Sequence, residues 1–193
     1  MINWDNHAKI SRAAAVLQDA GVVAYPTEAV WGLGCDPWSE QAVSRILQLK
    51  GRSEGKGLIL IAHHSHYFAP FLHGLDADQL VSFNRTYDKP ITWLVPDNGV
   101  APDWIVGQHT TLALRVTAHP VASALCRAFG GPLVSTSANP QGLPEATTGL
   151  KVKSYFGSSL DYQTPGSIEG SNAWGAQNQQ HSLSPERHPQ VPH

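Results

Sequence analysis

Residues 25–34 read Tyr-Pro-Thr-Glu-Ala-Val-Trp-Gly-Leu-Gly, and they follow the short apolar run of residues 22–24. Such a run predicts a strand, and Pro26 lacks the backbone N–H that a continuing strand would need, so pairing should end near it. A loop carrying Thr27 and Glu28 is then expected at the strand end. Gly32 and Gly34 allow the backbone to bend or to approach another group closely, because glycine has no Cβ. Taken alone, the segment fits an ordinary strand and turn as well as a functional loop.

The composition fits one globular domain. The chain has 193 residues, of which 41% are hydrophobic and 15% are charged, enough for one well-buried core but short for two domains. The formal net charge of -2 gives no overall electrostatic case for nucleic acid binding, although a local basic patch is compatible with it. Two cysteines are too few for a disulfide framework, which favours a reducing compartment.

The N-terminal residues 1–6 lack the basic start and the apolar stretch of a signal peptide. No apolar run approaches the ~20 residues that a membrane-spanning helix needs. We therefore expect a cytoplasmic protein without a membrane segment.

Helices and strands are expected to alternate along the chain. Apolar residues at helical spacing predict helices over residues 8–20, 39–49, 76–87 and 120–129. Short apolar or alternating runs predict strands over residues 22–25, 57–62, 91–95 and 111–116 and from residue 132 onward, with a loop over residues 96–107. The order indicates an α/β fold, a single-domain twisted sheet with flanking helices, although the strand order does not follow from it.

The sequence also predicts the helix caps and the two faces of one strand. Ser39 and Asp76 should cap the second and third helices, and Asp5 or Asn6 the first, with Gly21 as the left-handed residue that ends it. In the run 111–116, alternation should place Thr111, Ala113 and Arg115 on one face of the strand.

The sequence changes character after Gly166. The remaining residues include only four large apolar side chains, Ile168, Trp174, Leu183 and Val191. So little apolar surface does not offset the entropy lost on ordering a chain. We therefore predict a domain over residues 1–166 and a flexible tail over residues 167–193.

Lys50-Gly51-Arg52 places two cations two residues apart, a suitable pair for gripping a phosphate chain. The same cations would also interact favourably with the C-terminus of the preceding helix. A P-loop is excluded, because Gly51 and Gly55 enclose three residues instead of four and Gly57 stands where a Ser or Thr should be.

The segment Ser135-Thr136-Ser137-Ala138-Asn139-Pro140 follows the last predicted strand. Its hydroxyls and its amide could bind phosphate oxygens or a small polar substrate. They could equally satisfy their own backbone in Ser/Thr and Asx turns.

The ten histidines and two cysteines do not indicate a metal site. His63, His64, His66 and His73 lie close in sequence, but no carboxylate or cysteine shares a ligand spacing with them. Surface histidines and, at Cys35, a small packed thiol are the expected interpretation.

Several of these motifs together resemble the YrdC family, also called TsaC, the threonylcarbamoyl-AMP synthases. The match covers roughly residues 8 to 165 and is closest to the short bacterial form. The motifs that carry it, in family order, are residues 25–34, Lys50-Gly51-Arg52, residues 57–61, Arg115-Val116 with His119-Pro120, and residues 135–139.

The resemblance implies an α/β domain with a concave basic cavity and a nucleotidyltransferase. Such an enzyme joins L-threonine, bicarbonate or CO2, and ATP, with Mg2+ accompanying the ATP, into L-threonylcarbamoyl-AMP and pyrophosphate. This product would feed the threonylcarbamoyladenosine modification of tRNA (t6A37) through a downstream complex of TsaB, TsaD and TsaE. Binding of tRNA or double-stranded RNA is implied as well.

The resemblance also implies roles for individual residues. Catalysis would fall to Lys50 and Arg52, which would hold the ATP phosphates. Threonine would be bound by Thr27, Arg115 and Ser135. The nucleotide site would add Thr111, Ser137 and Asn139.

The chain departs from the family pattern at several positions, including Trp31, where Tyr or Phe is common, and the serious departure is the tail. Ser53 stands where the family usually has Pro, which looks tolerable. The tail after Gly166 lacks the family segment that packs beside the active site, and it resembles an unrelated or frame-shifted end. The alternatives are a non-catalytic RNA-binding or ribosome-maturation module and an inactive homologue with a damaged tail.

Overall fold

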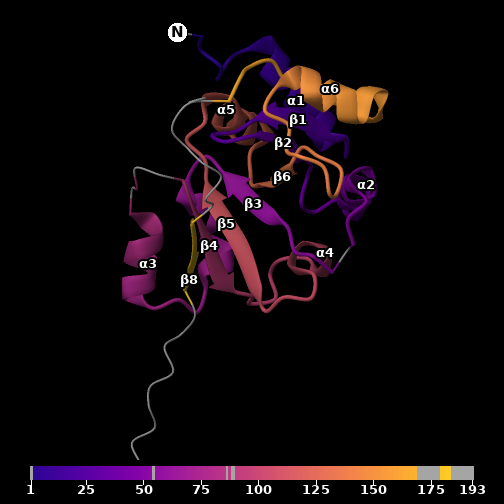
Figure 1. The fold of residues 1–193 in the computed structure, drawn as a ribbon. Helices are drawn as coiled ribbons and strands as arrows, with labels where there is room; N and C mark the ends of the chain where they lie inside the picture. The colour runs from indigo at the N-terminus through magenta and orange to yellow at the C-terminus, as the bar shows by residue number, and fades with distance from the viewer. Residues whose placement is uncertain (1, 54, 86, 88–89, 169–178, 184–193) are drawn as a thin grey trace, which may run out of the picture.

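The computed structural model describes residues 2–53, 55–85, 87, 90–168 and 179–183, and Figure 1 shows how the elements are arranged. The helices are α1 (Ala8–Gln18), α2 (Glu40–Lys50), α3 (Ala77–Asn84), α4 (Asp103–Val106), α5 (Pro120–Phe129) and α6 (Gly149–Phe156), with 3-10 helices η1 (Ser65–Leu72) and η2 (Gly157–Ser159). The strands are β1 (Val23–Pro26), β2 (Trp31–Gly34), β3 (Ile59–Ala62), β4 (Ile91–Pro96), β5 (Thr111–Val116), β6 (Leu133–Ser137), β7 (Tyr162–Gln163) and β8 (Gln179–Ser182). The predicted α/β fold is confirmed.

The eight strands form a mixed sheet in the order β7-β1-β2-β6-β3-β5-β4-β8. Strands β3 and β5 are parallel, and both the β3–β6 and the β4–β5 pairs are antiparallel. The register sets Ile61 opposite Arg115 and Ile59 opposite Ser135. Cross-strand partners point to the same face, so this register brings side chains distant in sequence onto one surface.

Residues 25–34 form an antiparallel hairpin. Strand β1 ends at Pro26 as predicted, but the chain re-enters the sheet at Trp31, so the two glycines lie in strand β2. Gly34 permits close packing, since a Cβ there would lie 2.6 Å from the Val134 carbonyl oxygen and 2.7 Å from the Tyr25 ring.

Helices cover the two faces of the sheet unequally. On one face α1 and α5 pack on each other and on β1 and β3 (Figure 1). Their shared core contains Leu17, Tyr25 and Leu125, which are fully buried. The opposite face carries a larger core with contributions from α2, η1, α3 and α4. Part of the first face, over β3, β5 and β6, is left for a cavity.

The helix caps follow the sequence predictions at two of three positions. Ser39 and Asp76 accept hydrogen bonds at the starts of α2 and α3. At α1 the cap is His7 rather than Asp5 or Asn6. The left-handed residue after α1 is Ala20 (φ 59°), not Gly21. Gly21 is needed for space, since a Cβ there would lie 2.5 Å from the Val16 side chain.

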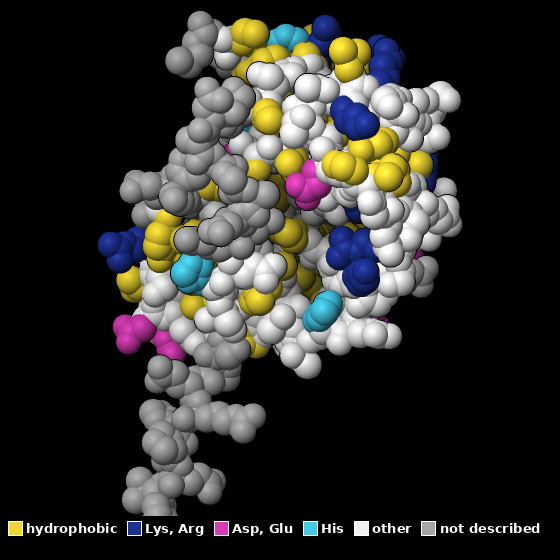
Figure 2. Space-filling view, viewed as in Figure 1, with side chains coloured by type: hydrophobic (Ala, Val, Ile, Leu, Met, Phe, Trp, Pro, Cys, Tyr) yellow, Lys and Arg dark blue, Asp and Glu magenta, His cyan; other side chains and the backbone are white. Residues whose placement is uncertain are grey.

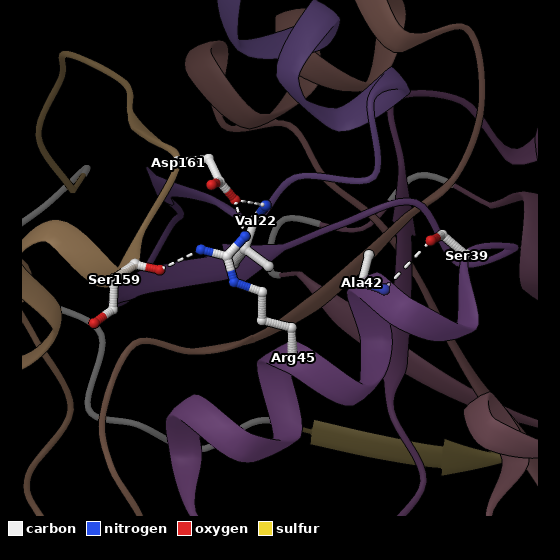
Figure 3. Close-up of polar contacts among 6 residues, drawn as sticks. All are labelled: Val22, Ser39, Ala42, Arg45, Ser159 and Asp161. Atoms are coloured by element: carbon white, nitrogen blue, oxygen red, sulfur yellow. Dashed lines mark hydrogen bonds and ion pairs between the residues drawn. The ribbon is translucent and has the colours of Figure 1, made fainter.

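Helices α4 and α6 and strand β7 are among the elements that had no sequence prediction. Helix α4 interrupts the predicted loop over residues 96–107, and α6 with β7 follows the polar segment after β6. Arg45 of α2 ties this region to the sheet, as Figure 3 shows. Its guanidinium donates to Asp161 Oδ2 (2.5 Å) and to the Ser159 carbonyl (2.7 Å), and Asp161 Oδ2 also accepts from the Val22 N–H.

Two short segments of the predicted tail, residues 167–193, contact the domain. The Ser167 carbonyl lies 3.1 Å from His119 Nε2, which donates to it because His119 Nδ1 accepts from the Val121 N–H. Strand β8 pairs in parallel with β4, and Leu183 is 8% exposed within the larger core. The rest of the predicted tail, residues 169–178 and 184–193, lies outside the described residues.

Among the described residues, every helix is too short or too polar to cross a lipid bilayer.

Candidate active site

A cavity of about 420 Å³ opens on the sheet face that α1 and α5 leave uncovered. Cavities of this volume accommodate small molecules. The strands supply its floor through Ile59 and Ile61 of β3, Thr111, Ala113 and Arg115 of β5, and Ser135 and Ser137 of β6. In Figure 2 the surface is hollowed near its centre, between basic side chains on one border and an acidic side chain on another.

The alternation of side chains along β5 decides which residues reach the cavity. Thr111, Ala113 and Arg115 line it, whereas Leu112 and Leu114 point into the larger core. The predicted two-faced strand is therefore confirmed at these positions. This alternation brings the Arg115 cation to the floor of the cavity.

Arg115 is anchored beneath the cavity by its neighbour strand. Its Nε and Nη2 lie 2.8 and 2.5 Å from Thr92 Oγ1, on β4. Burial lowers the pKa of Arg115, and the nearby Glu28 and Tyr25 act in the opposite direction. Because the ordinary pKa of an arginine lies far above neutral, the side chain stays cationic at neutral pH.

Arg52 reaches the cavity from the segment that follows α2. Its Nη2 donates to the Gly57 carbonyl (2.9 Å), and Nη1 lies 3.5 Å from Thr136 Oγ1. Its Nε is buried without a hydrogen-bond partner in the described part of the chain. Arg52 lines the cavity, so its cation would attract an anionic ligand there.

Thr27 and Glu28 line the cavity from the β1–β2 loop. The Thr27 hydroxyl donates to the Val30 carbonyl at 2.6 Å. Its single proton is therefore used, and toward a ligand it can act only as an acceptor.

Glu28 belongs to the cavity but was given no role from the sequence. Its Oε1 accepts from Thr117 Oγ1 (2.8 Å) and from the backbone N–H groups of Ala118 (3.1 Å) and His119 (3.2 Å). The carboxylate thus fixes the segment that leads into α5. The sequence offered one signal for Glu28, its place between Thr27 and Ala29 within residues 25–34. Its hydrogen-bond partners lie about ninety residues further along the chain, so the sequence did not reveal them.

Lys50 differs from the expectation that it holds phosphates, because it is not among the residues that line the cavity. It is 5% exposed, and its Nζ donates to the Ser137 carbonyl and to the backbone and side-chain oxygens of Asn139 (2.8 and 3.2 Å). Burial, and secondarily Arg52, lower the pKa of Lys50 to about 8. Lys50 therefore holds the loop after β6 from below.

Asn139 is also engaged in this loop. Its Oδ1 accepts from Ser137 Oγ (2.7 Å), and its Nδ2 donates to the Leu143 carbonyl (2.7 Å). Asn139 does not line the cavity, whereas Ser137 does. Because the Ser137 proton is used internally, its oxygen presents lone pairs to a ligand.

The charges in the cavity are mixed. Two arginines, Arg52 and Arg115, are accompanied by two carboxylates, Glu28 and Glu145, and by His109. Among the described residues, no group of three or more His, Cys, Asp or Glu side chains could hold a metal ion. The arrangement suits a ligand that carries both negative and positive groups.

Comparison with known proteins gives a consistent assignment. The Sua5/YciO/YrdC sequence family, described as "Telomere recombination", matches residues 15–173. The chain belongs to this family. A relative from Cellvibrio japonicus, named threonylcarbamoyl-AMP synthase, is 51% identical over 86% of this chain and 88% of its own. A relative of the same name from Halorhodospira halophila is 52% identical over 84% and 85%.

Solved structures of the family share the fold. P. abyssi Sua5 complexed with L-threonine superposes with a TM-score of 0.76 at 29% identity, over 82% of this chain and 47% of that one. This chain therefore spans about half the length of the Sua5 protein. E. coli YciO superposes with a TM-score of 0.71 at 23% identity, over 85% and 82%, which supports the fold alone.

Proposed function

We propose that this member of the Sua5/YciO/YrdC family is a threonylcarbamoyl-AMP synthase. It would join L-threonine, bicarbonate or CO2, and ATP, and release pyrophosphate. The observation that carries the proposal is the convergence of Arg52 and Arg115, from two motifs far apart in sequence, on one cavity with a rim of hydroxyl groups. The names of the two relatives support the reaction, and the complex of P. abyssi Sua5 supports threonine as a substrate.

The amino acid would lie over β5. Arg115 offers a cation to the threonine carboxylate, in a cavity where a charged hydrogen bond is stronger than in water. The Thr27 oxygen, which can only accept, suits the donor groups of the ammonium or the side-chain hydroxyl. Ser135, opposite Ile59, would complete this subsite.

The nucleotide would lie toward Arg52. Arg52 lines the cavity and would offer its cation to the phosphate oxygens. Thr111 and Ser137 line the same cavity and would contribute hydroxyls. Lys50 and Asn139 would act indirectly, because their hydrogen bonds hold Ser137 and the loop behind it.

The chemistry needs no side-chain nucleophile. The neutral threonine amine forms a bond to CO2 and loses one proton to solvent, which gives a carbamate that keeps one N–H. A carbamate oxygen then attacks the α-phosphorus of ATP, and the bond to the β-phosphate oxygen breaks, so pyrophosphate leaves with the electron pair. The residues of the cavity accelerate this step by holding the two reactants together and by neutralising the negative charge on the phosphates.

Mg2+ would enter as the partner of ATP. This ion prefers oxygen ligands, and it is usually held by phosphates and one or two carboxylates. Glu145 lines the cavity with an exposed side chain, whereas Glu28 already accepts three hydrogen bonds on one oxygen. Glu145 therefore fits the ion better. When bound, Mg2+ would neutralise phosphate charge.

The product would pass to a downstream transferase complex for tRNA modification in the cytoplasm, as the resemblance to the family implies. Binding of tRNA or double-stranded RNA is part of the same proposal. Because the cavity holds both positive and negative side chains, any RNA contact should use the surface around it rather than the cavity floor.

The test is pyrophosphate release from ATP with L-threonine and bicarbonate by the full chain. Arg52→Ala should lower kcat/KM for ATP at least about 100-fold, because a charged contact to the leaving phosphates is lost. Arg12→Ala is a matched control: it removes an exposed arginine of α1 that stacks on Tyr162 outside the cavity. It should leave the rate unchanged.

Three outcomes separate the alternatives. Release that needs all three substrates and Arg52 supports the synthase. No release, with salt-dependent binding of tRNA, would favour the non-catalytic module. No release by the full chain, but release after residues 167–193 are replaced by those of the Cellvibrio japonicus relative, would identify an inactive enzyme with a damaged tail.

A further inference from the structure

We propose that Thr92 is a positioning residue for Arg115, and that it sets the affinity of the cavity for the amino-acid substrate without touching it. This inference rests on the proposed function for the identity of that substrate. Thr92 was not singled out from the sequence and is not among the residues that line the cavity.

The first support is geometric. The β4–β5 register pairs Trp93 with Leu114, so Thr92 and Arg115 lie one residue further along the same antiparallel pair. Their side chains share the face on which Leu94 and Ala113, also paired, line the cavity. Thr92 Oγ1 receives two N–H groups of the same guanidinium, Nε at 2.8 Å and Nη2 at 2.5 Å.

This contact decides how Arg115 is presented. Nε and Nη2 form one edge of the planar guanidinium, and Thr92 occupies that edge. A carboxylate in the cavity must therefore approach a different edge. The rotation of the guanidinium about its own axis is fixed before the ligand arrives, which leaves less conformational entropy to lose on binding.

Burial makes the contact strong. Thr92 is fully buried, and Arg115 is only partly exposed. A hydrogen bond between a cation and a hydroxyl contributes more where water does not compete, and it costs more to leave unmade. Threonine is also β-branched, so its χ1 angle is restricted on a strand and its oxygen stays in place.

A second charge acts on Arg115 from the opposite part of the site. Glu28 favours the cation electrostatically, and its own position is fixed by Thr117 and the start of α5. Arg115 is thus oriented by a hydrogen bond from β4 and attracted by a carboxylate from the β1–β2 loop. Strand β4, which contributes only Leu94 to the cavity lining, would in this way control substrate affinity.

The competing explanation is that Thr92 merely satisfies polar groups in a buried strand. Thr92→Val keeps the shape and removes the acceptor, and Thr92→Ser keeps the acceptor and removes a methyl group. A purely structural role predicts that Thr92→Val changes thermal stability but treats L-threonine and ATP alike. A positioning role predicts a change specific to L-threonine.

The experiment combines a double-mutant cycle with a spectroscopic readout on the full chain. Calorimetric titration with L-threonine, and the KM values for L-threonine and ATP, are measured for wild type, Thr92→Val, Thr92→Ser, Arg115→Ala and the Thr92→Val/Arg115→Ala double variant. In parallel, NMR follows solvent exchange of the Arg115 Nε–H.

Thr92→Val should weaken L-threonine at least about tenfold while the KM for ATP changes less than about twofold, as expected for the loss of a hydrogen bond to a charged group. Thr92→Ser should restore wild-type affinity, and in the Arg115→Ala background Thr92→Val should have no further effect on L-threonine. The Nε–H should exchange slowly in wild type and Thr92→Ser and rapidly in Thr92→Val.

The inference is overturned if Thr92→Val binds L-threonine like wild type, if it weakens L-threonine equally with and without Arg115, or if the Nε–H exchanges at the same rate in all variants. A wild-type chain that neither binds L-threonine nor releases pyrophosphate would refute the proposed function instead. The exchange measurement would then still decide whether Thr92 holds Arg115.

Discussion

Glu28 Oε1 lies 3.2 Å from the backbone nitrogen of His119, the N-cap residue of α5. Thr117 and Ala118 donate to the same oxygen, so one carboxylate of the β1–β2 loop collects three donors from the segment between β5 and α5. This contact closes one side of the cavity. It also places a negative charge near the first turn of a helix, where the helix dipole favours it.

Replacing this carboxylate should destabilise the fold. Glu28→Gln keeps the size but removes the charge, so three charge-assisted hydrogen bonds become weaker. We expect a loss of about 1–3 kcal/mol in the free energy of unfolding, measured by urea denaturation. Glu145→Gln, at an exposed position of the same cavity, should change it by less than about 0.5 kcal/mol. Equal effects of the two variants would contradict the anchoring role of Glu28.

The two glycines of β2 should respond differently to alanine. At Gly34 a Cβ would lie 2.6 Å from the Val134 carbonyl oxygen, a backbone atom that cannot move without disturbing the sheet. At Gly32 the nearest atoms would be 3.4 and 3.5 Å away, an ordinary contact. Gly34→Ala should therefore cost at least about 2 kcal/mol of unfolding free energy, within the range for overpacking. Gly32→Ala should lower the melting temperature by only a few degrees at most. A greater loss of stability in Gly32→Ala than in Gly34→Ala would refute the hairpin packing.

The attachment of the β8 segment to the core can be tested at Leu183, the residue that directly follows the strand. Leu183 is 8% exposed and packs in the larger core, whereas Val81 of α3 is 69% exposed. Leu183→Ala should cost about 2 kcal/mol, at the low end for a buried leucine, and Val81→Ala should be nearly neutral. The readout is chemical denaturation of both variants beside wild type. If Leu183→Ala is as neutral as Val81→Ala, β8 does not contribute to the folded core.

Most of the fold could be predicted from the sequence, because the signals for its helices and strands are local. Ser39 and Asp76 begin helices as predicted, and the alternation through Thr111 and Arg115 puts the correct face toward the cavity. Strand β2 was missed because its glycines suggested a turn, and only the pairing with β1 and β6 explains why they lie in a strand. Strand β8 was also missed, because it consists of polar residues and its place in the sheet depends on pairing with β4.

The site was predicted less completely than the fold. Arg52, Arg115 and the hydroxyl residues meet in one cavity, as the resemblance implied. Sequence order could not reveal that Lys50 points away from the cavity into the loop of Asn139. Glu28 and Thr92 were overlooked as partners for the same reason: their hydrogen bonds depend on strand pairing and on contacts distant in sequence.

Buried titratable groups give the protein a pH dependence with opposing contributions. Burial lowers the pKa of Lys50 from 10.5 to about 8. Between these values the unfolded chain binds more protons than the native chain, so stability rises with pH. Burial raises the pKa of Cys35 and Cys126 from 9.0, and that of Tyr25 from 10.0. Above pH 9 the unfolded chain loses protons that these groups keep, so stability falls as pH rises.

The free energy of unfolding should therefore rise between pH 8 and pH 9, by at most about 1.4 kcal/mol for one proton, and fall above pH 9. Urea denaturation at half-unit steps from pH 7.5 to pH 10 measures this curve. Lys50→Met should abolish the rise, because no titrating amine is left, and Cys126→Ala should make the fall shallower. A wild-type stability that falls from pH 8 to pH 9, as expected for Lys50→Met, would show that the three oxygens around Lys50 Nζ keep its pKa near the ordinary value, with the amine cationic in both states.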